Sequence, residues 1–316
     1  MSARYIRNLL MLCICFAASY TLRAQDASRL YVEKDGWAIG TNCGMSDLWG
    51  DVGTKSVVDH YNNSKYFDKV TFMGGMFGRY SIHPCLGVRL AANYGSLYAT
   101  DKWNYDLAKK ATSQDADAYQ RYARAQNAKD YIFEGSILLE FMPFRMNPES
   151  KMAGRRGQPF LGLGFAYFHY TPYSTVAASP SYVATYDLHL EGQGFGDGFP
   201  PKYSLWQPAI PLVIGYRWDL GQHLNLGIEY MYRKTFTDYL DGVSGKYISA
   251  ADFKAHLTPK DAALAAQVAD KGYWLNLEPP NAAGNLRGNP SDKDGYSTIT
   301  ITFYYKVHTR NRTWWK

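Results

Sequence analysis

The sequence predicts an all-β fold, a single eight-stranded antiparallel transmembrane β-barrel whose long extracellular loops contain short helices. Three observations support this fold. Apolar and polar residues alternate through several long segments, and a tilted strand needs about 9–11 residues to cross a bilayer. The alternating segments number eight, and single-chain bacterial barrels have an even number of strands. Long and short connections between these segments follow one another in turn.

Residues 1–24 are typical of a cleaved secretory signal peptide. Arg4 and Arg7 precede an apolar stretch at 9–20, and cleavage after Ala24 leaves residues 25–316 as one barrel domain. Removing the segment takes away three arginines and no acids, so the formal net charge falls from +6 to +3. That charge is too small to indicate a nucleic-acid partner.

Transmembrane helices are excluded, because no long apolar run follows residue 20 and the mean hydropathy is −0.36. A barrel has low hydropathy because only alternate residues are apolar. A large secreted all-β domain would share this composition. The assignment to a membrane therefore depends on the alternation of long and short connections. Cys43 and Cys85 remain after cleavage, and whether they form a disulfide is left open.

Eight strands are expected in chain order. Their ranges are 36–50, 70–82, 86–98, 131–143, 158–170, 205–218, 223–235 and 295–307. The connections at 51–69, 99–130, 171–204 and 238–294 are long, and those at 83–85, 144–157 and 219–222 are shorter. Outer-membrane barrels have short periplasmic turns and long outward loops. This parity predicts an outer-membrane location with both termini in the periplasm.

The strand over residues 223–235 shows the pattern most clearly. One of its faces is wholly apolar or aromatic, with Leu224, Leu226, Ile228, Tyr230 and Tyr232. The other face carries Glu229 and Arg233, and this period of two indicates a strand. Its partner contains Pro208 and Pro211, which cannot donate to a sheet ladder. We therefore expect a bulge near the outer rim, or regular pairing only from Leu212.

Two helices are expected in the loops. Residues 114–128 favour a helix by propensity. A second helix begins after Thr258, which is followed by Pro259 and Asp261, and it ends before Gly272. Residues 191–201 are rich in glycine and proline and predict turns.

The inward faces of the strands collect charged residues. They are Arg79, Arg89, Glu134, Glu140, Arg217, Glu229 and Arg233. An eight-stranded barrel is just wide enough for side chains to fill it. Unpaired buried charges cost several kcal/mol each, so we expect a packed, ion-paired interior and keep a charged conducting pore as the alternative.

Candidate hydrolytic sites are weak. Asp59 precedes His60, and Asp187 lies two residues before His189, but sequence proximity does not establish an acid–base pair. The sequence has no Gly-x-Ser-x-Gly elbow. The run Asp292 to Gly295 begins like a calcium loop, but its twelfth position is Phe303, so it predicts a turn. We expect no enzyme activity, cofactor or metal.

Several runs carry a family resemblance. They are TDYLDGVS at 237–244, LEGQG at 190–194, QPAIPLVIGYRW at 207–218 and YIFEGSILLEF at 131–141. These runs resemble the PorG-type outer-membrane barrels of Bacteroidetes, the domain family DUF6089. The resemblance covers most of the mature chain and is strongest over 131–247. The large segment 245–294 departs from the family pattern.

The resemblance implies a non-catalytic outer-membrane subunit of the type IX protein secretion machinery. Such a subunit would associate with a periplasmic ring of a PorK-type lipoprotein and a PorN-type protein, and with outer-membrane lipids. Two alternatives stay open, a small-solute porin and a surface adhesion or binding barrel.

The periplasmic edge is the expected docking surface, because it faces the compartment of the ring. The candidate contact residues are His83, Pro84, Arg145, Lys151, Arg155, Arg156, Arg310 and Arg312. The run TDYLDGVS falls at the opposite, outer rim, where we expect it to shape the rim and begin the long loop.

Overall fold

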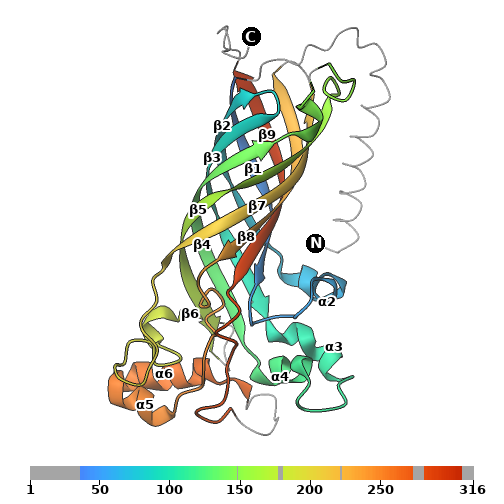
Figure 1. Cartoon of the computed structure of the whole chain (residues 1–316). Helices are drawn as coiled ribbons and strands as arrows, with labels where there is room; N and C mark the ends of the chain where they lie inside the picture. Colours follow the sequence, from blue (N-terminus) through green and yellow to red (C-terminus); the bar gives the residue numbers. More distant parts are fainter. Residues whose placement is uncertain (1–35, 148, 177–180, 221–222, 273–280, 308–316) are drawn as a thin grey trace.

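The computed structural model describes residues 36–147, 149–176, 181–220, 223–272 and 281–307. Eight long strands form a closed antiparallel barrel (Figure 1). They are β1 (Trp37–Trp49), β2 (Thr71–His83), β3 (Leu86–Thr100), β4 (Asn127–Phe141), β5 (Gly157–Thr175), β7 (Trp206–Asp219), β8 (Leu224–Thr235) and β9 (Gly295–Val307). Pairing of β4 with β5 closes the barrel. The predicted eight-stranded antiparallel barrel is confirmed.

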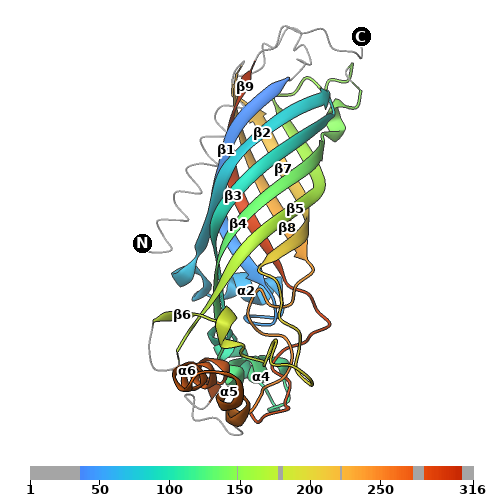
Figure 2. The same ribbon diagram turned by 90° about the vertical axis from the view of Figure 1, so that its left-hand side faces the viewer.

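All the long connections lie at one end of the barrel, here called the loop end (Figures 1 and 2). The other end, the turn end, carries only the shorter connections. Trp37 pairs with Val307, so both ends of the described chain lie at the turn end. The predicted signal peptide at 1–24 falls outside the described residues.

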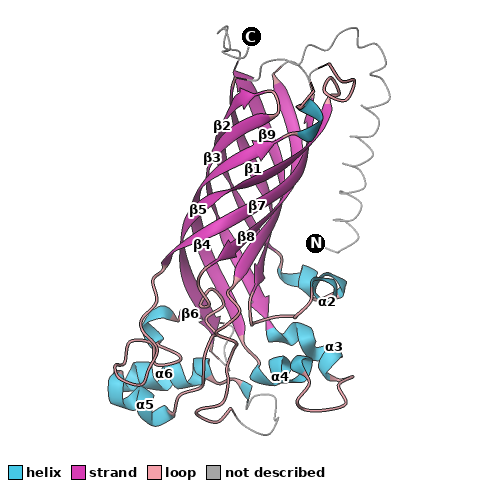
Figure 3. Cartoon of the chain, in the orientation of Figure 1, coloured by secondary structure: helices cyan, strands magenta, loops and turns pink. Residues whose placement is uncertain are grey.

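The loop end carries the helices, as Figure 3 shows by colour. They are α2 (Val57–Asn62), α3 (Tyr105–Ala108), α4 (Asp117–Arg124), α5 (Ala250–His256) and α6 (Pro259–Ala269), with 3₁₀ turns at Tyr66–Lys69, Asp101–Asn104 and Tyr186–Leu188. A further 3₁₀ turn, Pro143–Arg145, lies at the turn end. None of the described helices is both long and apolar enough to cross a membrane.

An apolar belt surrounds the barrel wall. Strand β8 alternates exposed and buried positions along its length, and the neighbouring strands behave alike. Ile39, Leu90 and Ile214 are 58%, 57% and 58% exposed. Aromatic pairs lie toward both edges of the belt, with Tyr167 on Trp206 near the loop end and Trp37 on Tyr80 near the turn end. This surface suits a hydrocarbon surround flanked by two interfaces.

Strand β7 corrects the expectation about its prolines. It begins at Trp206, and its register with β8 continues without a shift from Asp219 to Ala209. Its ladder with β5 is interrupted only between Leu212 and Ala209, where Pro211 lies, and resumes in the same register. The expected bulge and the expected start of regular pairing at Leu212 are therefore both wrong. The missing donor of Pro211 opens a gap on one side of the strand.

The loop helices follow the sequence only in part. Helix α6 begins after Thr258, whose side chain accepts from the Asp261 amide, as expected. Helix α4 is shorter than predicted, because Ala125 adopts a left-handed φ of 56° and ends it. The chain then enters β4 at Asn127. A short strand, β6 (Tyr182–Ala184), pairs with the outer end of β5 and was not expected.

The loop end has a hydrophobic core of its own. Helices α5 and α6 pack against Leu188 and Leu190 through Phe253, Ala265 and neighbouring residues. A separate core of strand-end residues, including Leu97 and Ile132, lies at the outer part of the barrel. The loops thus form a folded cap over the outer end of the barrel.

Candidate functional site

Glu140 is the centre of a charge cluster inside the barrel. Its carboxylate lies 2.7 Å from Arg79 Nε, 3.2 Å from Arg89 Nε and 2.6 Å from Arg217 Nη2. Arg89 also reaches Glu229, with Nη1 2.7 Å from Oε2. These side chains come from β2, β3, β4, β7 and β8. Pairing of this kind offsets the cost of burying charge.

A second cluster lies nearer the loop end. The Glu134 carboxylate accepts from Arg233 Nε at 2.7 Å, from the Tyr296 hydroxyl at 2.6 Å and from Asn93 Nδ2 at 2.9 Å. Glu134 and Glu140 are six residues apart on β4, which corresponds to about 20 Å along a strand. The seven interior charges thus bridge the lumen at two levels.

Aromatic rings fill the remaining interior beside these charges. The Arg217 guanidinium lies 3.8 Å from the centroid of the Phe160 ring and 5.8 Å from that of Tyr304. Both rings are at most 5% exposed. The interior near Glu140 is therefore packed with side chains, as expected for a barrel of this size.

The run TDYLDGVS forms the rim between the barrel and the cap. Asp241 Oδ2 accepts from the Val52 amide at 2.7 Å, and Asp294 Oδ2 accepts from the Leu240 amide at 2.8 Å. Gly242 has a φ of +73°, a conformation that side chains rarely adopt. The motif thereby ties the β1–β2 loop to the start of β9.

Glu191 joins this rim to the preceding long loop. Its carboxylate accepts from the amides of Ser244 and Gly245, at 2.9 and 2.8 Å, and lies 2.8 Å from Arg287 Nη1. Arg287 Nη1 also donates to the Gly242 carbonyl at 2.6 Å. The two runs most specific to the family resemblance, LEGQG and TDYLDGVS, are thus in direct contact.

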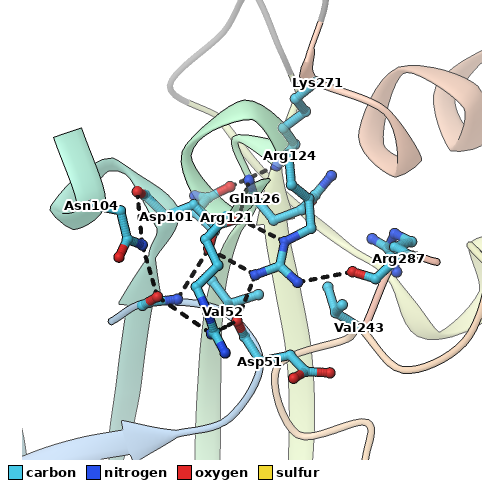
Figure 4. Close-up of polar contacts among 12 residues, drawn as sticks. Asp51, Val52, Asp101, Asn104, Arg121, Arg124, Gln126, Val243, Lys271 and Arg287 are labelled. Atoms are coloured by element: carbon cyan, nitrogen blue, oxygen red, sulfur yellow. Dashed lines mark hydrogen bonds and ion pairs between the residues drawn. The ribbon is translucent and has the colours of Figure 1, made fainter. Parts of the chain in front are cut away.

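A buried ion pair continues the network toward α4 (Figure 4). Arg124 Nε lies 2.8 Å from Asp101 Oδ2, and Arg124 Nη1 donates to the Arg287 carbonyl at 2.8 Å. Gln126 Nε2 donates to the Ala269 carbonyl at the end of α6. Lys271 Nζ contacts Asn127 Oδ1 at 2.6 Å. This network, here called the cap network, connects all four long loops.

Burial perturbs several groups of the rim and cap. It raises the pKa of Asp238 to about 7, and burial together with Asp51 raises the pKa of Asp241 to about 7. Burial and the neighbouring Asp241 also raise the pKa of Asp294. Burial, assisted by Arg287, lowers the pKa of Lys271 to about 7. Among the described residues, no histidine, cysteine or carboxylate groups are arranged to hold a metal ion.

Sequence reasoning missed most of the cap network. Asp101, Arg124, Arg287 and Lys271 carry no local motif, and each meets its partners through the folding of distant loops. Glu191, Gly242 and Ser244 lie in the two runs that the resemblance marks.

The candidate docking residues have different environments. Lys151, Arg155 and Arg156 are exposed in the β4–β5 connection at the turn end, and His83 is half-buried in the β2–β3 turn. Pro84 is buried, and so is Arg145, whose Nη2 lies 3.5 Å from Asp219 Oδ2. Arg310 and Arg312 fall outside the described residues.

Neither sequence-adjacent acid–histidine pair forms in the structure. His60 Nε2 lies 3.1 Å from Asp47 Oδ1, while Asp59 bonds Ser56 at the start of α2. The His189 ring contacts the Gln193 carbonyl, and Asp187 pairs with Lys202. Cys43 and Cys85 are both free thiols, with Cys43 exposed on the outer face of β1.

Comparison with protein families finds no match, and comparison with curated proteins finds none either. Among solved structures, the chain is similar to Neisserial surface protein A, with a TM-score of 0.36 and 10% identity over 86% of this chain and 97% of that one. It is also similar to Ail, the attachment invasion locus protein of Yersinia pestis, with a TM-score of 0.34 and 8% identity over 85% and 98% of the two chains. The chain is also similar to the outer membrane protein OprG from Pseudomonas aeruginosa. The TM-score is 0.33 and the identity is 10%, over 88% of this chain and 99% of that one. At these TM-scores the likeness carries no conclusion about what this chain binds.

Proposed function

We propose that the chain is a non-catalytic outer-membrane barrel that acts as a structural subunit of the type IX protein secretion machinery of Bacteroidetes. In this role the barrel is an anchor, and its turn end faces the periplasm. The partners are a ring of a PorK-type lipoprotein and a PorN-type protein. The PorG-type resemblance leads to these partners.

The observation that carries the proposal is the contact of Glu191 with Ser244 and Gly245. It joins the two runs on which the resemblance depends, although they lie about fifty residues apart in the sequence. Both runs are buried at this contact, with Glu191 1% and Ser244 4% exposed. A shared buried contact explains why the two runs would occur together in one family.

The packed interior favours an anchor over a porin. Glu140, Arg89 and Glu229 bridge the lumen, and each is at most 2% exposed. Water-filled channels are found in barrels with many more strands. A conducting pore would have to break these ion pairs, at a cost of several kcal/mol for each charge left unpaired.

The turn end supplies the surface for a periplasmic partner. Arg155 and Arg156 are adjacent and exposed, and Lys151 is exposed in the same connection. Arg145 is buried and lies 3.5 Å from Asp219, so the proposal assigns it a role in supporting this surface. The proposed contact surface is therefore narrower than the sequence suggested, and Lys151, Arg155 and Arg156 form its described basic part.

A gene deletion tests the proposal. A clean deletion should retain type IX cargo in the periplasm, and cross-linked membranes of the complemented strain should yield the PorK-type and PorN-type proteins with this chain. Normal cargo secretion in the deletion strain would reject the role in secretion.

A second candidate function is a surface-binding barrel. The specific observation that favours it is the folded cap, which has its own hydrophobic core around Phe253 and Ala265. Removing residues 245–288 from the loop end separates the two candidates. A surface-binding protein would lose its ligand, whereas the secretion subunit would keep its periplasmic partners.

A further inference from the structure

We propose that the barrel wall binds an anionic, phosphate-bearing membrane lipid, with the headgroup phosphate between Lys69 and Lys129 and an acyl chain in an apolar groove below them. Lys69 lies just before β2 and Lys129 lies at the loop end of β4, with β3 between the two strands, next to the apolar belt. The site is separate from the turn-end surface and does not depend on the secretion role.

The headgroup part of the site places two ammonium groups over tyrosine rings. Lys129 Nζ lies 4.9 Å from the centroid of the Tyr131 ring and 5.0 Å from that of Tyr182. Lys69 Nζ lies 5.1 Å from the centroid of the Tyr98 ring. The β3–β4 register places Lys129 directly opposite Tyr98. Both lysines therefore lie beside Tyr98 on the outer wall.

This cluster faces outward at the edge of the belt. Lys129 shares the outer face of β4 with Tyr131 and Phe133, which are 38% and 50% exposed. Lys69 is exposed just before β2 begins. Lysine and tyrosine are suited to this position, because their apolar parts contact hydrocarbon while their polar ends reach the headgroup layer.

A shallow, open groove of about 700 Å³ lies lower on the same wall. Its floor includes Gly78, Ala92 and Gly135 on β2, β3 and β4, and its sides include Leu90, Ile137 and Tyr167. A Cβ added at Gly78 or Gly135 would meet no atom within 4 Å. These glycines therefore leave a depression in a wall that is otherwise covered by large side chains.

The spacing of the two parts fits one lipid. Gly135 lies six residues beyond Lys129 on β4. Gly135 pairs with Ala92 of β3, and Lys129 pairs with Tyr98 of β3. Six residues of strand span about 20 Å. Because barrel strands tilt by about 35–45°, this length corresponds to a depth of about 15 Å, half the thickness of a hydrocarbon core of about 30 Å. The groove therefore lies near the midplane, where an acyl chain from that headgroup would end.

A lipid accounts for both parts better than a protein or a free anion does. The lysines require negative charge, and the groove requires an apolar group about 20 Å away at membrane depth. Free phosphate would leave the groove unused. A purely apolar partner segment would leave the two ammonium groups without a counter-charge.

Native mass spectrometry of the delipidated full chain tests the site. The probes are phosphatidylglycerol, phosphatidylcholine of the same chain length, and glycerol phosphate. We expect phosphatidylglycerol to bind first, and the variant K69Q/K129Q to lower its affinity about tenfold, toward that of phosphatidylcholine. The matched control K234Q/K293Q, in lysines of the opposite wall, should change it less than about twofold.

A second variant tests the groove. Gly135→Leu fills it from a position where a side chain has room, so the barrel should still fold, as its heat-modifiable gel mobility will show. We expect weaker binding of both lipids by this variant. Equal losses in K69Q/K129Q and K234Q/K293Q, or glycerol phosphate binding as tightly as the lipid, would overturn the proposal. Unchanged lipid binding by folded Gly135→Leu would do the same.

Discussion

Arg89 on β3 and Glu229 on β8 meet inside the barrel, with Nη1 of the arginine 2.7 Å from Oε2 of the glutamate. Along one side of the barrel, strands β2, β1 and β9 separate β3 from β8. The pair therefore crosses the lumen and does not join neighbouring strands. It shares Arg89 with the Glu140 cluster, so one network holds both walls of the barrel.

Glu140→Ala should destabilise the barrel by about 3–5 kcal/mol, because three guanidinium groups lose their common carboxylate. The measurement is the urea midpoint for unfolding from lipid vesicles. The exposed Glu149→Ala is the matched control, and a surface change of this kind is expected to alter stability by less than about 0.5 kcal/mol. Equal midpoints for the two variants would show that the cluster adds little stability.

The packed lumen predicts that the purified protein gives no steady conductance in planar bilayers. R89S/E229S removes one pair that crosses the lumen without leaving a single unpaired charge. We expect this variant to show open-channel events that the wild-type protein lacks. R155S/R156S, at the exposed turn end, should remain closed. Stable wild-type channels would instead support the small-solute porin.

The strands could be predicted from the sequence because inward-facing and outward-facing side chains alternate along every barrel strand. The range predicted for the last strand, 295–307, agrees with β9, and the inward charges occupy the interior as their positions on alternate faces require. Which interior charges form ion pairs with one another could not be predicted from this alternation. Glu140 meets Arg217, a residue on a different strand, through side-chain geometry that has no counterpart in the sequence pattern.

The cap was less predictable than the barrel. Glu191 and Arg287 are 96 residues apart, and neither belongs to a regular element. Strand β6 has three residues, too few to show a period of two. Helix α4 ends at a left-handed alanine, where glycine would have given a signal.

Glu191→Ala should loosen the cap while leaving the barrel folded. The amides of Ser244 and Gly245 lose their acceptor, and Arg287 is left as a buried charge beside the Gly242 carbonyl. Leaving such a charge unpaired costs about 3–5 kcal/mol. Hydrogen exchange should show faster labelling of 237–250 and 285–290, with β8 and β9 unchanged. The control is Asp197→Ala in the exposed part of the same loop, and faster exchange throughout the barrel would contradict a local role.

The rim should become less stable as pH rises from about 4 to about 7. Asp238 and Asp241 have a folded-state pKa of about 7, above the usual 3.8. Their contribution to stability is therefore fully present below about pH 4 and is lost as pH rises through 7. Lys271, with its pKa lowered to about 7, acts in the opposite direction and only between about pH 7 and 10.5. Changes in rim stability in the window between about pH 5 and pH 7 therefore reflect the deprotonation of Asp238 and Asp241.

Hydrogen exchange of residues 237–244, corrected for the intrinsic rate, measures this effect. Protection should fall several-fold across the window in the wild-type chain and much less in D238N/D241N. The variant D106N changes an exposed aspartate elsewhere in the cap and should keep the wild-type profile. A pH-independent wild-type rim would show that the two carboxyl groups do not take up protons on folding.

Charge reversal at the turn end tests the periplasmic docking surface. R155E/R156E should reduce recovery of the PorK-type and PorN-type proteins at least about tenfold, because like charges facing an acidic partner cost several kcal/mol. K109E/K110E reverses an adjacent exposed pair at the loop end and is the matched control, since the proposed orientation places it on the other side of the membrane. Both variants should reach the membrane in equal amounts. If R155E/R156E recovers the ring proteins as well as the wild-type chain does, the basic β4–β5 connection is not the contact, and the docking surface lies elsewhere on the turn end.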